Sequence, residues 1–415
     1  MENSPALELA KHTLLLFGVI LGLGTLSSLL ARLIRAPDVA VFLLAGMLVG
    51  PDALGLLDIS AASSVNQLIL IFGASYILFD GGASIRLGVL KKVWITILLL
   101  ATVGVLITAA ITGLAAYYFL HVPFIVALLL GAVLSSTDPA TLVPVFKQVR
   151  IRSRIAQTVM SESAFNDAMG AILTFAVLGI AMGSGSFSIA DALIDLMKQT
   201  LYGIAIGGVL GYLAALLISH ERFGFLEEFA PVVTLMAVIG AYIAADGMHS
   251  SGFMAVFVFG IMLGNVESLG FPRSMAENRQ LEDFVMTTAL IMRMFIFILL
   301  GSQVNFALMD RYLYAGAVVV AIFMLVARPC TVFLCALPDR RARWSFKELL
   351  FMCWTRETGV IPGALSGMLL GVKAPGAEIV ASVAFIAILV TILVQATTTS
   401  WVAKRLGLLS GGEAD

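Results

Sequence analysis

About thirteen apolar runs, each long enough to cross a lipid bilayer, follow one another along this chain with only short polar connections. The chain holds 60% hydrophobic and 12% charged residues, which places it outside the composition of soluble globular proteins. The sequence therefore predicts an all-α integral membrane protein. The expected spans are 11–34, 37–54, 64–85, 92–119, 123–147, 154–181, 191–219, 227–246, 250–267, 282–301, 311–336, 346–371 and 377–403.

Basic residues gather on alternate connections. One set of connections carries most of the Lys and Arg residues, whereas the other carries only Lys11, Lys198, Arg311 and Lys373. By the positive-inside rule the first set is cytoplasmic, which places the N-terminus outside and requires an odd number of spans. Residues 406–415 then form a short cytoplasmic tail. The first apolar run has no small-residue cleavage site, so it is expected to be a retained span.

Two neighbouring apolar runs carry a carboxylate near their middle, Asp138 and Asp167. An ionisable side chain at that depth costs roughly 2.5–3.5 kcal/mol to insert, so it marks a functional site by default. Asp138 is followed by Pro139, which cannot continue a helix and disfavours helical geometry in the residue before it. The fifth span is therefore predicted to be interrupted, with its freed backbone groups lining a cavity.

A second apolar run is irregular in the same way. Between Thr355 and Pro362 it contains the charge pair Arg356 and Glu357, together with Gly359. Two interrupted spans at corresponding places in the two halves of a chain are typical of inverted repeats with a central binding site. We expect spans 1–6 to be paired with spans 8–13, and the two interrupted helices to cross near the middle of the membrane.

The residues around the first interruption suit a small monovalent cation. Ser163 and Asp167 lie four residues apart and share one face of the sixth span. Together with Asp138 and the backbone of Thr137, they offer the oxygen ligands that hard cations prefer. A carboxylate in such a site binds either a proton or a cation, and that competition is sufficient for exchange. Asp138, Asp167 and Ser163 are the predicted ligands of the metal ion, and no cofactor is expected.

Other buried polar residues have less direct roles. Glu162 lies one turn closer to the cytoplasm than Asn166, and Arg356 lies at a similar depth on another span, so these two charges are predicted to form a structural ion pair. Asn166 is expected to position neighbouring groups through hydrogen bonds.

The sequence leaves the roles of three further charged residues unassigned. Asp80 is either a charge near the membrane interface or a residue of the ion path. Arg293 lies within the tenth span and must face protein or a cavity, and the role of Glu357 is not assigned.

Thr137-Asp138-Pro139 on one interrupted span, followed by Glu162-Ser163-Ala164-Phe165-Asn166-Asp167 on the next, resembles the monovalent cation:proton antiporter-1 family of sodium/proton exchangers. The resemblance implies an antiporter fold, a homodimer and an elevator-like movement of a core domain (92–185 and 306–405) against a dimerisation domain (1–91 and 186–305). It also implies that Asp167 carries the exchanged ion, with Asp138, Ser163 and Thr137 as further ligands.

The same resemblance bears on charge balance and on the cation. Asn166, where electrogenic relatives have a second aspartate, implies electroneutral exchange, and Glu162 with Arg356 matches the structural ion pair of the family. The flanks of Arg356 depart from the usual glycine-flanked pattern. Phe79-Asp80-Gly81-Gly82 resembles the bacterial branch that includes potassium/proton exchangers.

The predicted function is secondary antiport of cytoplasmic Na⁺ or Li⁺ for external H⁺, in the inner membrane of a prokaryote. A K⁺/H⁺ antiporter of the same fold is the alternative. Two membrane aspartates also raise the hypothesis of an intramembrane aspartyl protease, but the Gly-x-Gly-Asp element of such proteases is missing. A gated cation channel is a third possibility, and it would pass current.

Overall fold

Long apolar helices make up most of the molecule. The computed structural model describes residues 5–34, 36–137, 146, 151–183, 189–219, 226–271 and 279–409. Within these ranges, nine helical segments are long and apolar enough to cross a membrane, and four shorter apolar helices accompany them. Nine and four give the thirteen spans expected from the sequence, so the all-α membrane fold is confirmed.

Thirteen spans correspond to more than thirteen helices because several spans are divided. In the first half the helices are α1 Pro5–Ile34, α2 Asp38–Val49, α3 Ser64–Ala83, α4 Leu87–Ala101, α5 Val103–Leu120, α6 Phe124–Leu134 and α8 Ser153–Ala181. In the second half they are α9 Ile189–Ser219, α10 Ala230–Gly247, α11 Gly252–Gly264, α12 Arg279–Ser302, α13 Phe306–Ile322, α14 Arg328–Ala336, α15 Phe346–Trp354, α16 Val360–Gly371, α17 Ala377–Val390 and α18 Thr397–Leu406.

Two spans near the end of the chain contain a π-helical turn. Phe323–Ala327 joins α13 to α14, and Thr391–Ala396 joins α17 to α18. A π-helical turn holds an extra residue, so it changes the direction in which the following side chains point. Such turns recur at functional sites. Here they flank the span that divides into α15 and α16.

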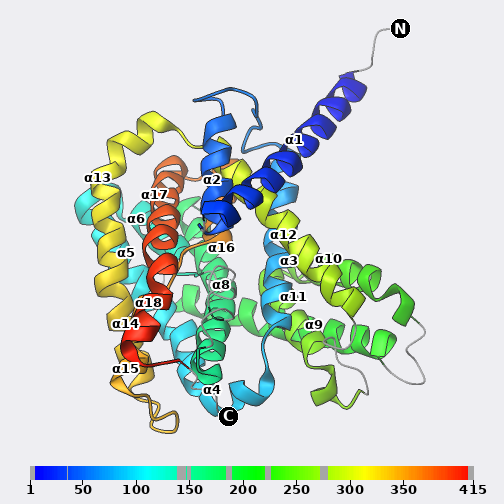
Figure 1. Cartoon of the computed structure of the whole chain (residues 1–415), viewed down its shortest axis with the longest axis vertical. Helices are drawn as coiled ribbons and strands as arrows, with labels where there is room; N and C mark the ends of the chain where they lie inside the picture. Colours follow the sequence, from blue (N-terminus) through cyan, green and yellow to red (C-terminus); the bar gives the residue numbers. More distant parts are fainter. Residues whose placement is uncertain are drawn as a thin grey trace.

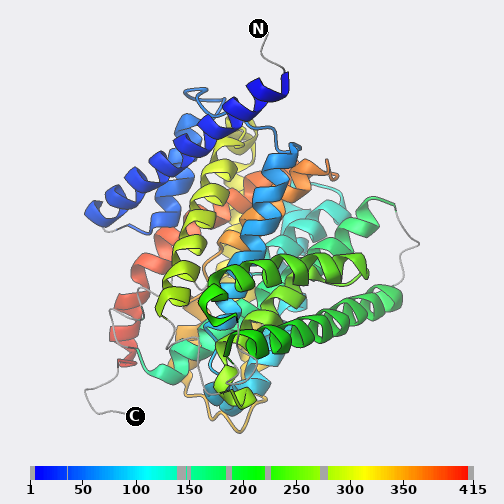
Figure 2. The same cartoon turned by 90° about the vertical axis from the view of Figure 1, so that its right-hand side faces the viewer.

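The helices fall into two sets of neighbours (Figures 1 and 2). In one set α5 packs on α6, α4 on α8, and α13 on α17. In the other set α11 packs on α3 and α9, while α12 packs on α2 and α3. The sets touch where α16 and α8 lie against α3. Figure 1 shows α3, α8 and α16 near the middle of the molecule, with α5 and α13 on one side and α9 and α10 on the other.

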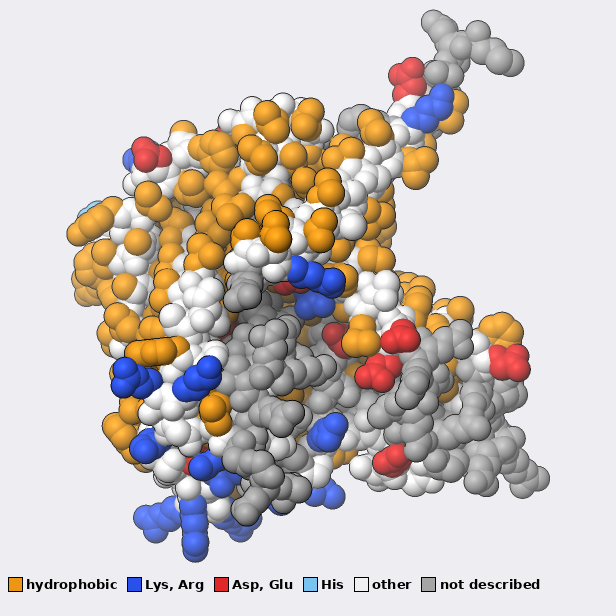
Figure 3. Space-filling model, viewed as in Figure 1, with side chains coloured by type: hydrophobic (Ala, Val, Ile, Leu, Met, Phe, Trp, Pro, Cys, Tyr) orange, Lys and Arg blue, Asp and Glu red, His pale blue; other side chains and the backbone are white. Residues whose placement is uncertain are grey.

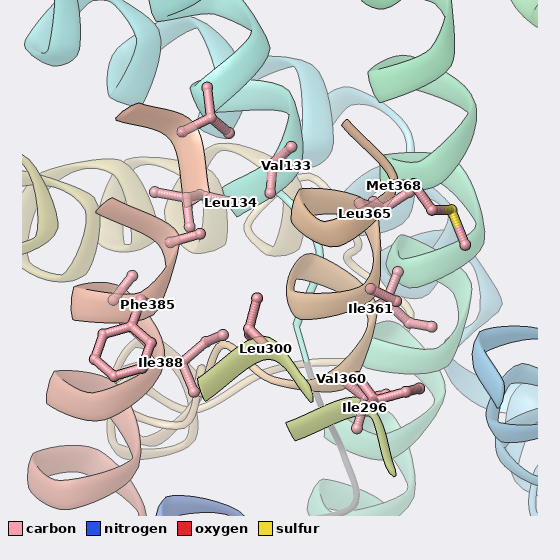
Figure 4. Close-up of a cluster of buried hydrophobic side chains, with 14 of the residues drawn as sticks. Val133, Leu134, Ile296, Leu300, Val360, Ile361, Leu365, Met368, Phe385 and Ile388 are labelled. Carbon is pink, nitrogen blue, oxygen red and sulfur yellow. The ribbon is translucent and has the colours of Figure 1, made fainter. Parts of the chain in front are cut away.

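Apolar side chains fill the space between α6, α12, α16 and α17 (Figure 4). Leu134 at the end of α6, Leu300 on α12 and Phe385 on α17 converge there with the side chains of α16. Leu134 and Phe385 are fully buried. This core holds the end of α6 in place, and the end of α6 is where the predicted interruption begins.

The last described residues of the chain return to the connection that precedes α8. Leu409 forms an isolated antiparallel β-bridge with Ile151, and the Arg152 backbone N–H donates to the Leu408 carbonyl at 3.2 Å. The Leu408 side chain is buried in an apolar cluster that also contains Ile155. The segment after α18 is therefore fixed to the start of the helix that carries Asp167.

Candidate functional site

The first interruption is held by side chains of α8. α6 ends at Leu134, and Asn166 Oδ1 accepts hydrogen bonds from the backbone N–H of Thr137 at 3.1 Å and from its hydroxyl at 3.0 Å. The hydroxyls of Thr137 and Ser163 share a third hydrogen bond of 2.7 Å. Because the Thr137 proton goes to Asn166, Ser163 is the donor in this bond. A backbone N–H freed by the interruption thus finds its partner on α8.

Asp167 lies on the same face of α8 as these contacts. Ser163 and Asn166 face the interruption, as does Gly170, and Asp167 falls between them at helical spacing. Its side chain is only 4% exposed. A Cβ atom added at Gly170 would come within 2.8 Å of the Ser136 Cβ atom, so glycine is required for the close approach of α8 to the interruption.

The second interruption meets the first. α15 ends at Trp354 and α16 begins at Val360, so the predicted interruption of this span is confirmed. The Arg356 Nη2 atom between them donates to the Ser135 carbonyl at 2.6 Å. Its guanidinium also lies over the Phe323 ring, 5.2 Å from the centroid. A fixed positive charge therefore lies at the C-terminal end of α6, where the helix dipole is negative.

The predicted ion pair between Glu162 and Arg356 is wrong, because Glu162 pairs with Arg328. Arg328 Nη1 and Nη2 each donate to one oxygen of the Glu162 carboxylate, the second at 2.8 Å. Arg328 Nε donates to the Met352 carbonyl at 2.8 Å, which fixes the plane of the guanidinium. Arg356 is instead engaged by the carbonyl at the first interruption.

Sequence reasoning missed Arg328, although a signal for it was present. It is an ionisable residue inside the apolar run 311–336, and Pro329 follows it. The rule that singled out Asp167 therefore applied equally to Arg328. Its side chain is only 1% exposed.

A small void, without room for a water molecule, lies between the two interruptions and α8. It is lined by Thr137, Val159, Glu162, Ser163, Thr355, Arg356 and Glu357. Most of these side chains carry oxygen atoms, which are the ligands that hard cations prefer. The structure therefore brings together Thr137, Ser163, Glu162 and Arg356, and it places the fully buried Glu357 beside them.

Asp167 and Asn166 of α8 are not among the residues that line this void, and neither are the predicted residues Asp80 and Arg293. Asp80 is half-buried on α3, where the adjacent Gly81 faces the Ala164 Cβ atom of α8. Arg293 is half-buried on α12, a helix that packs against α1, α2 and α3. Asp138, the predicted ligand next to Pro139, lies outside the described residues.

Comparisons with known proteins all identify cation/proton exchangers, and the matches extend over most of the chain. The family model described as sodium/hydrogen exchanger, transmembrane, matches residues 18–405. The chain is 32% identical over 357 residues to Na(+)/H(+) antiporter 1 of Methanocaldococcus jannaschii, covering 84% of this chain and 81% of that relative. It is 30% identical over 411 residues to K(+)/H(+) antiporter NhaP of Alkalimonas amylolytica, covering 97% of this chain and 68% of that relative.

A solved structure agrees with the architecture as well. The structure of the sodium proton antiporter MjNhaP1 from Methanocaldococcus jannaschii at pH 8 superposes with a TM-score of 0.80 at 29% sequence identity. The superposition covers 94% of this chain and 97% of that chain. The two chains therefore share one fold.

Proposed function

Because this chain belongs to the transmembrane sodium/hydrogen exchanger family, we propose that it exchanges cytoplasmic Na⁺ or Li⁺ for external H⁺, with Asp167 as the group for which the two ions compete. The family consists of cation/proton antiporters, so the chain is a transporter and not an enzyme. This excludes the aspartyl protease hypothesis. The exchanged ions are its substrates, and the reaction needs no cofactor.

One observation carries the proposal: the carboxylate of Asp167 is buried on the face of α8 that holds the interrupted helix. Burial removes hydration from a charged carboxylate, and a bound proton offsets that loss by neutralising the charge. A bound cation favours the charged form in the same place. Proton and cation therefore exclude each other at one site, which couples their movements.

The hydrogen-bond directions favour Ser163 as a second ligand. Asn166 Oδ1 takes both protons that Thr137 can donate, so the proton of Ser163 points to Thr137. The lone pairs of Ser163 Oγ are then available to a cation held between Ser163 and Asp167. Asn166 contributes no charge of its own, which supports electroneutral exchange of one ion for one proton.

Potassium is the alternative substrate. The relative named as a K(+)/H(+) antiporter is 30% identical to this chain, close to the 32% of the relative named as a Na(+)/H(+) antiporter. Overall identity therefore does not discriminate between the cations. Selectivity depends on cavity size and on the spacing of the oxygen ligands.

The packing of the helices supports a moving core. We propose that residues 92–185 and 306–405 move against residues 1–91 and 186–305, and that the second group also forms a homodimer. A Cβ atom added at Gly363 or Gly367 of α16 would meet side chains of the other group, Leu300 and Leu70, whereas one added at Gly371 would meet both the Gln67 side chain and the Ala61 carbonyl. Side chains can rearrange during a movement more readily than backbone. The basic connections support an N-terminus outside and a C-terminus in the cytoplasm of a prokaryotic inner membrane.

Proton flux into reconstituted vesicles tests the proposal. A pH gradient is imposed, and Na⁺, Li⁺ and K⁺ are added in turn with the voltage either free or clamped. Collapse of the gradient by Na⁺ and Li⁺, unchanged by clamping, is the expected result. Collapse by K⁺ alone would establish the alternative substrate, whereas a cation-dependent current in place of proton flux would indicate a channel.

A further inference from the structure

Six exposed basic side chains, here called the basic rim, lie at one end of the helix bundle. Figure 3 shows Lys and Arg side chains gathered at the lower end of the molecule, beneath α14 and α15. The basic rim is defined here by the connection between α14 and α15 and by the end of α18. Its members are Arg340, Arg341, Arg343, Lys347, Lys404 and Arg405.

The two acidic residues next to the rim, Asp339 in the connection and Glu348 in the first turn of α15, are buried. Asp339 is 4% exposed, and its carboxylate accepts hydrogen bonds from the Thr96 hydroxyl at 2.6 Å and from the Arg341 and Ala342 N–H groups at 3.2 Å. Glu348 is 8% exposed and accepts from the Ser345 N–H at 2.8 Å. Among the described residues, no member of the rim has an ion-pair partner. The carboxylates of Asp339 and Glu348 are therefore engaged by neutral donors and leave the rim cations exposed to solvent.

The connection is held rigidly against α4 and α8. Trp344 Nε1 donates to the Thr96 hydroxyl at 2.9 Å, and the Arg154 guanidinium lies 4.1 Å from the centroid of the Trp344 ring. Arg343 has a φ of 46°, in the left-handed region that favours glycine. Arg343 thus carries a basic side chain at a backbone conformation that non-glycine residues rarely adopt. The rim is preorganised for a ligand, and its cations are not spread along a flexible tail.

Exposed apolar side chains lie at the same level as the cations. Phe346 is 65% exposed and Trp401 is 61% exposed, with the Arg405 guanidinium 5.5 Å from the centroid of the Trp401 ring. Trp354 Nε1 at the end of α15 donates to the Thr398 hydroxyl of α18 at 2.9 Å. Phe346 lies eight residues from that bond on α15, about 12 Å at ~1.5 Å per residue, and Arg405 lies seven residues from it on α18, about 10 Å.

We propose that the basic rim binds the phosphate headgroups of anionic phospholipids, with Phe346 and Trp401 placed at the boundary between headgroups and acyl chains. Aromatic side chains favour that boundary, and clustered Lys and Arg beside a membrane attract anionic lipids. In the orientation proposed above, the lipids belong to the cytoplasmic leaflet. Because the rim is bonded to α4 and α8, a bound lipid holds the part of the molecule that carries Asp167.

The test compares phosphatidylglycerol with phosphatidylcholine as additives to the full chain in neutral detergent, using the thermal unfolding midpoint. We expect phosphatidylglycerol to raise the midpoint and phosphatidylcholine to leave it unchanged. The triple variant Lys347→Gln/Lys404→Gln/Arg405→Gln should need ~100-fold more phosphatidylglycerol for the same rise, at roughly fivefold for each basic residue. High choline chloride should weaken the wild-type response by screening.

A matched control removes the same charge from the opposite end of the bundle, in Lys198→Gln/Arg311→Gln/Lys373→Gln. This variant should respond to phosphatidylglycerol like the wild type. An equal response from the rim variant, or an equal effect of phosphatidylcholine, would overturn the proposal. So would a full response to inorganic phosphate alone, which would make the rim a soluble-anion site.

A conservative variant separates binding from folding. Lys347→Arg/Lys404→Arg/Arg405→Lys keeps the charges and should keep the response. Its failure to respond, with an unchanged midpoint in phosphatidylcholine, would refute an electrostatic rim. Because the readout is unfolding and not exchange, the result does not depend on which cation is transported.

Discussion

The carboxylate of Glu162 and the guanidinium of Arg328 face each other in a two-point ion pair whose side chains are 2% and 1% exposed. This pair joins α8 to α14 beside the void between the two interrupted spans. Arg356 lies on the other side of that void and binds the Ser135 carbonyl. The two buried arginines therefore bind different partners. Arg328 binds the Glu162 carboxylate, and Arg356 binds a backbone carbonyl at the end of α6.

Glu162→Gln and Arg328→Gln should each destabilise the protein by about 3–5 kcal/mol, because each leaves its former partner buried and unpaired. The double variant should lose clearly less than the sum of the two single losses. The thermal unfolding midpoints of a double-mutant cycle in detergent measure this coupling. The matched cycle of Glu162→Gln with Arg356→Gln should show weaker coupling, because these two side chains share no ion-pair contact. Stronger coupling of Glu162 to Arg356 than to Arg328 would contradict the observed pairing.

Asp167→Asn should abolish exchange while leaving a folded protein, because the shape is kept and the titrating group is lost. Proton flux in vesicles and the elution volume in size-exclusion chromatography give the two readouts. Asp246→Asn, at an exposed position of α10, is the matched control and should exchange normally. Near-normal exchange by the Asp167 variant would end its assignment as the ion carrier.

Gly170→Ala should lower both stability and exchange rate. Its Cβ atom would lie 2.8 Å from the Ser136 Cβ atom, so α8 and the interruption must move apart. Overpacking of this kind costs about 1–3 kcal/mol. Gly240→Ala on α10 is the control, since no atom lies within 4 Å of the added Cβ. If the two variants unfold at the same temperature, the close approach of α8 at Gly170 does not contribute to the stability of the protein.

Asn166→Ala should cost about 1–3 kcal/mol, because it removes the acceptor of the buried Thr137 N–H and hydroxyl. Thermal unfolding measures the loss. Gln157→Ala, two turns earlier on α8, removes an amide whose buried oxygen has no hydrogen-bond partner among the described residues. The Gln157 variant should lose less stability than the Asn166 variant. A larger loss for the Gln157 variant would argue against a positioning role for Asn166.

Asp138→Ala should raise the cation concentration needed for half-maximal exchange, if the Asp138 carboxylate is a ligand as proposed. The vesicle assay described above measures that concentration for each cation. An unchanged value would reduce Asp138 to a residue that terminates a helix next to Pro139. The thermal unfolding midpoint serves as the control for folding.

The span count and both interruptions were predictable because their causes are local. Apolar length defines a span, and a proline next to a polar residue defines a break. The same local reasoning placed the end of the second span too late, at 54, whereas α2 ends at Val49. Pro51 explains the difference, since the residue before a proline disfavours helical geometry.

The partner of Glu162 was not predictable in the same way. Depth in the membrane is readable from position along a span, and it placed Arg356 level with Glu162. The choice between two arginines depends on the direction in which each side chain points. The π-helical turn at Phe323–Ala327 sets that direction for Arg328, and no simple sequence pattern predicts such a turn.

The β-bridge between Ile151 and Leu409 has a practical consequence for anyone who labels this protein. An affinity tag or fluorescent reporter fused closely behind Leu409 would disturb the segment that is hydrogen-bonded to the start of α8. Such a fusion would report on a perturbed transporter. A tag placed before α1, or separated from Leu409 by a long flexible spacer, leaves that attachment intact.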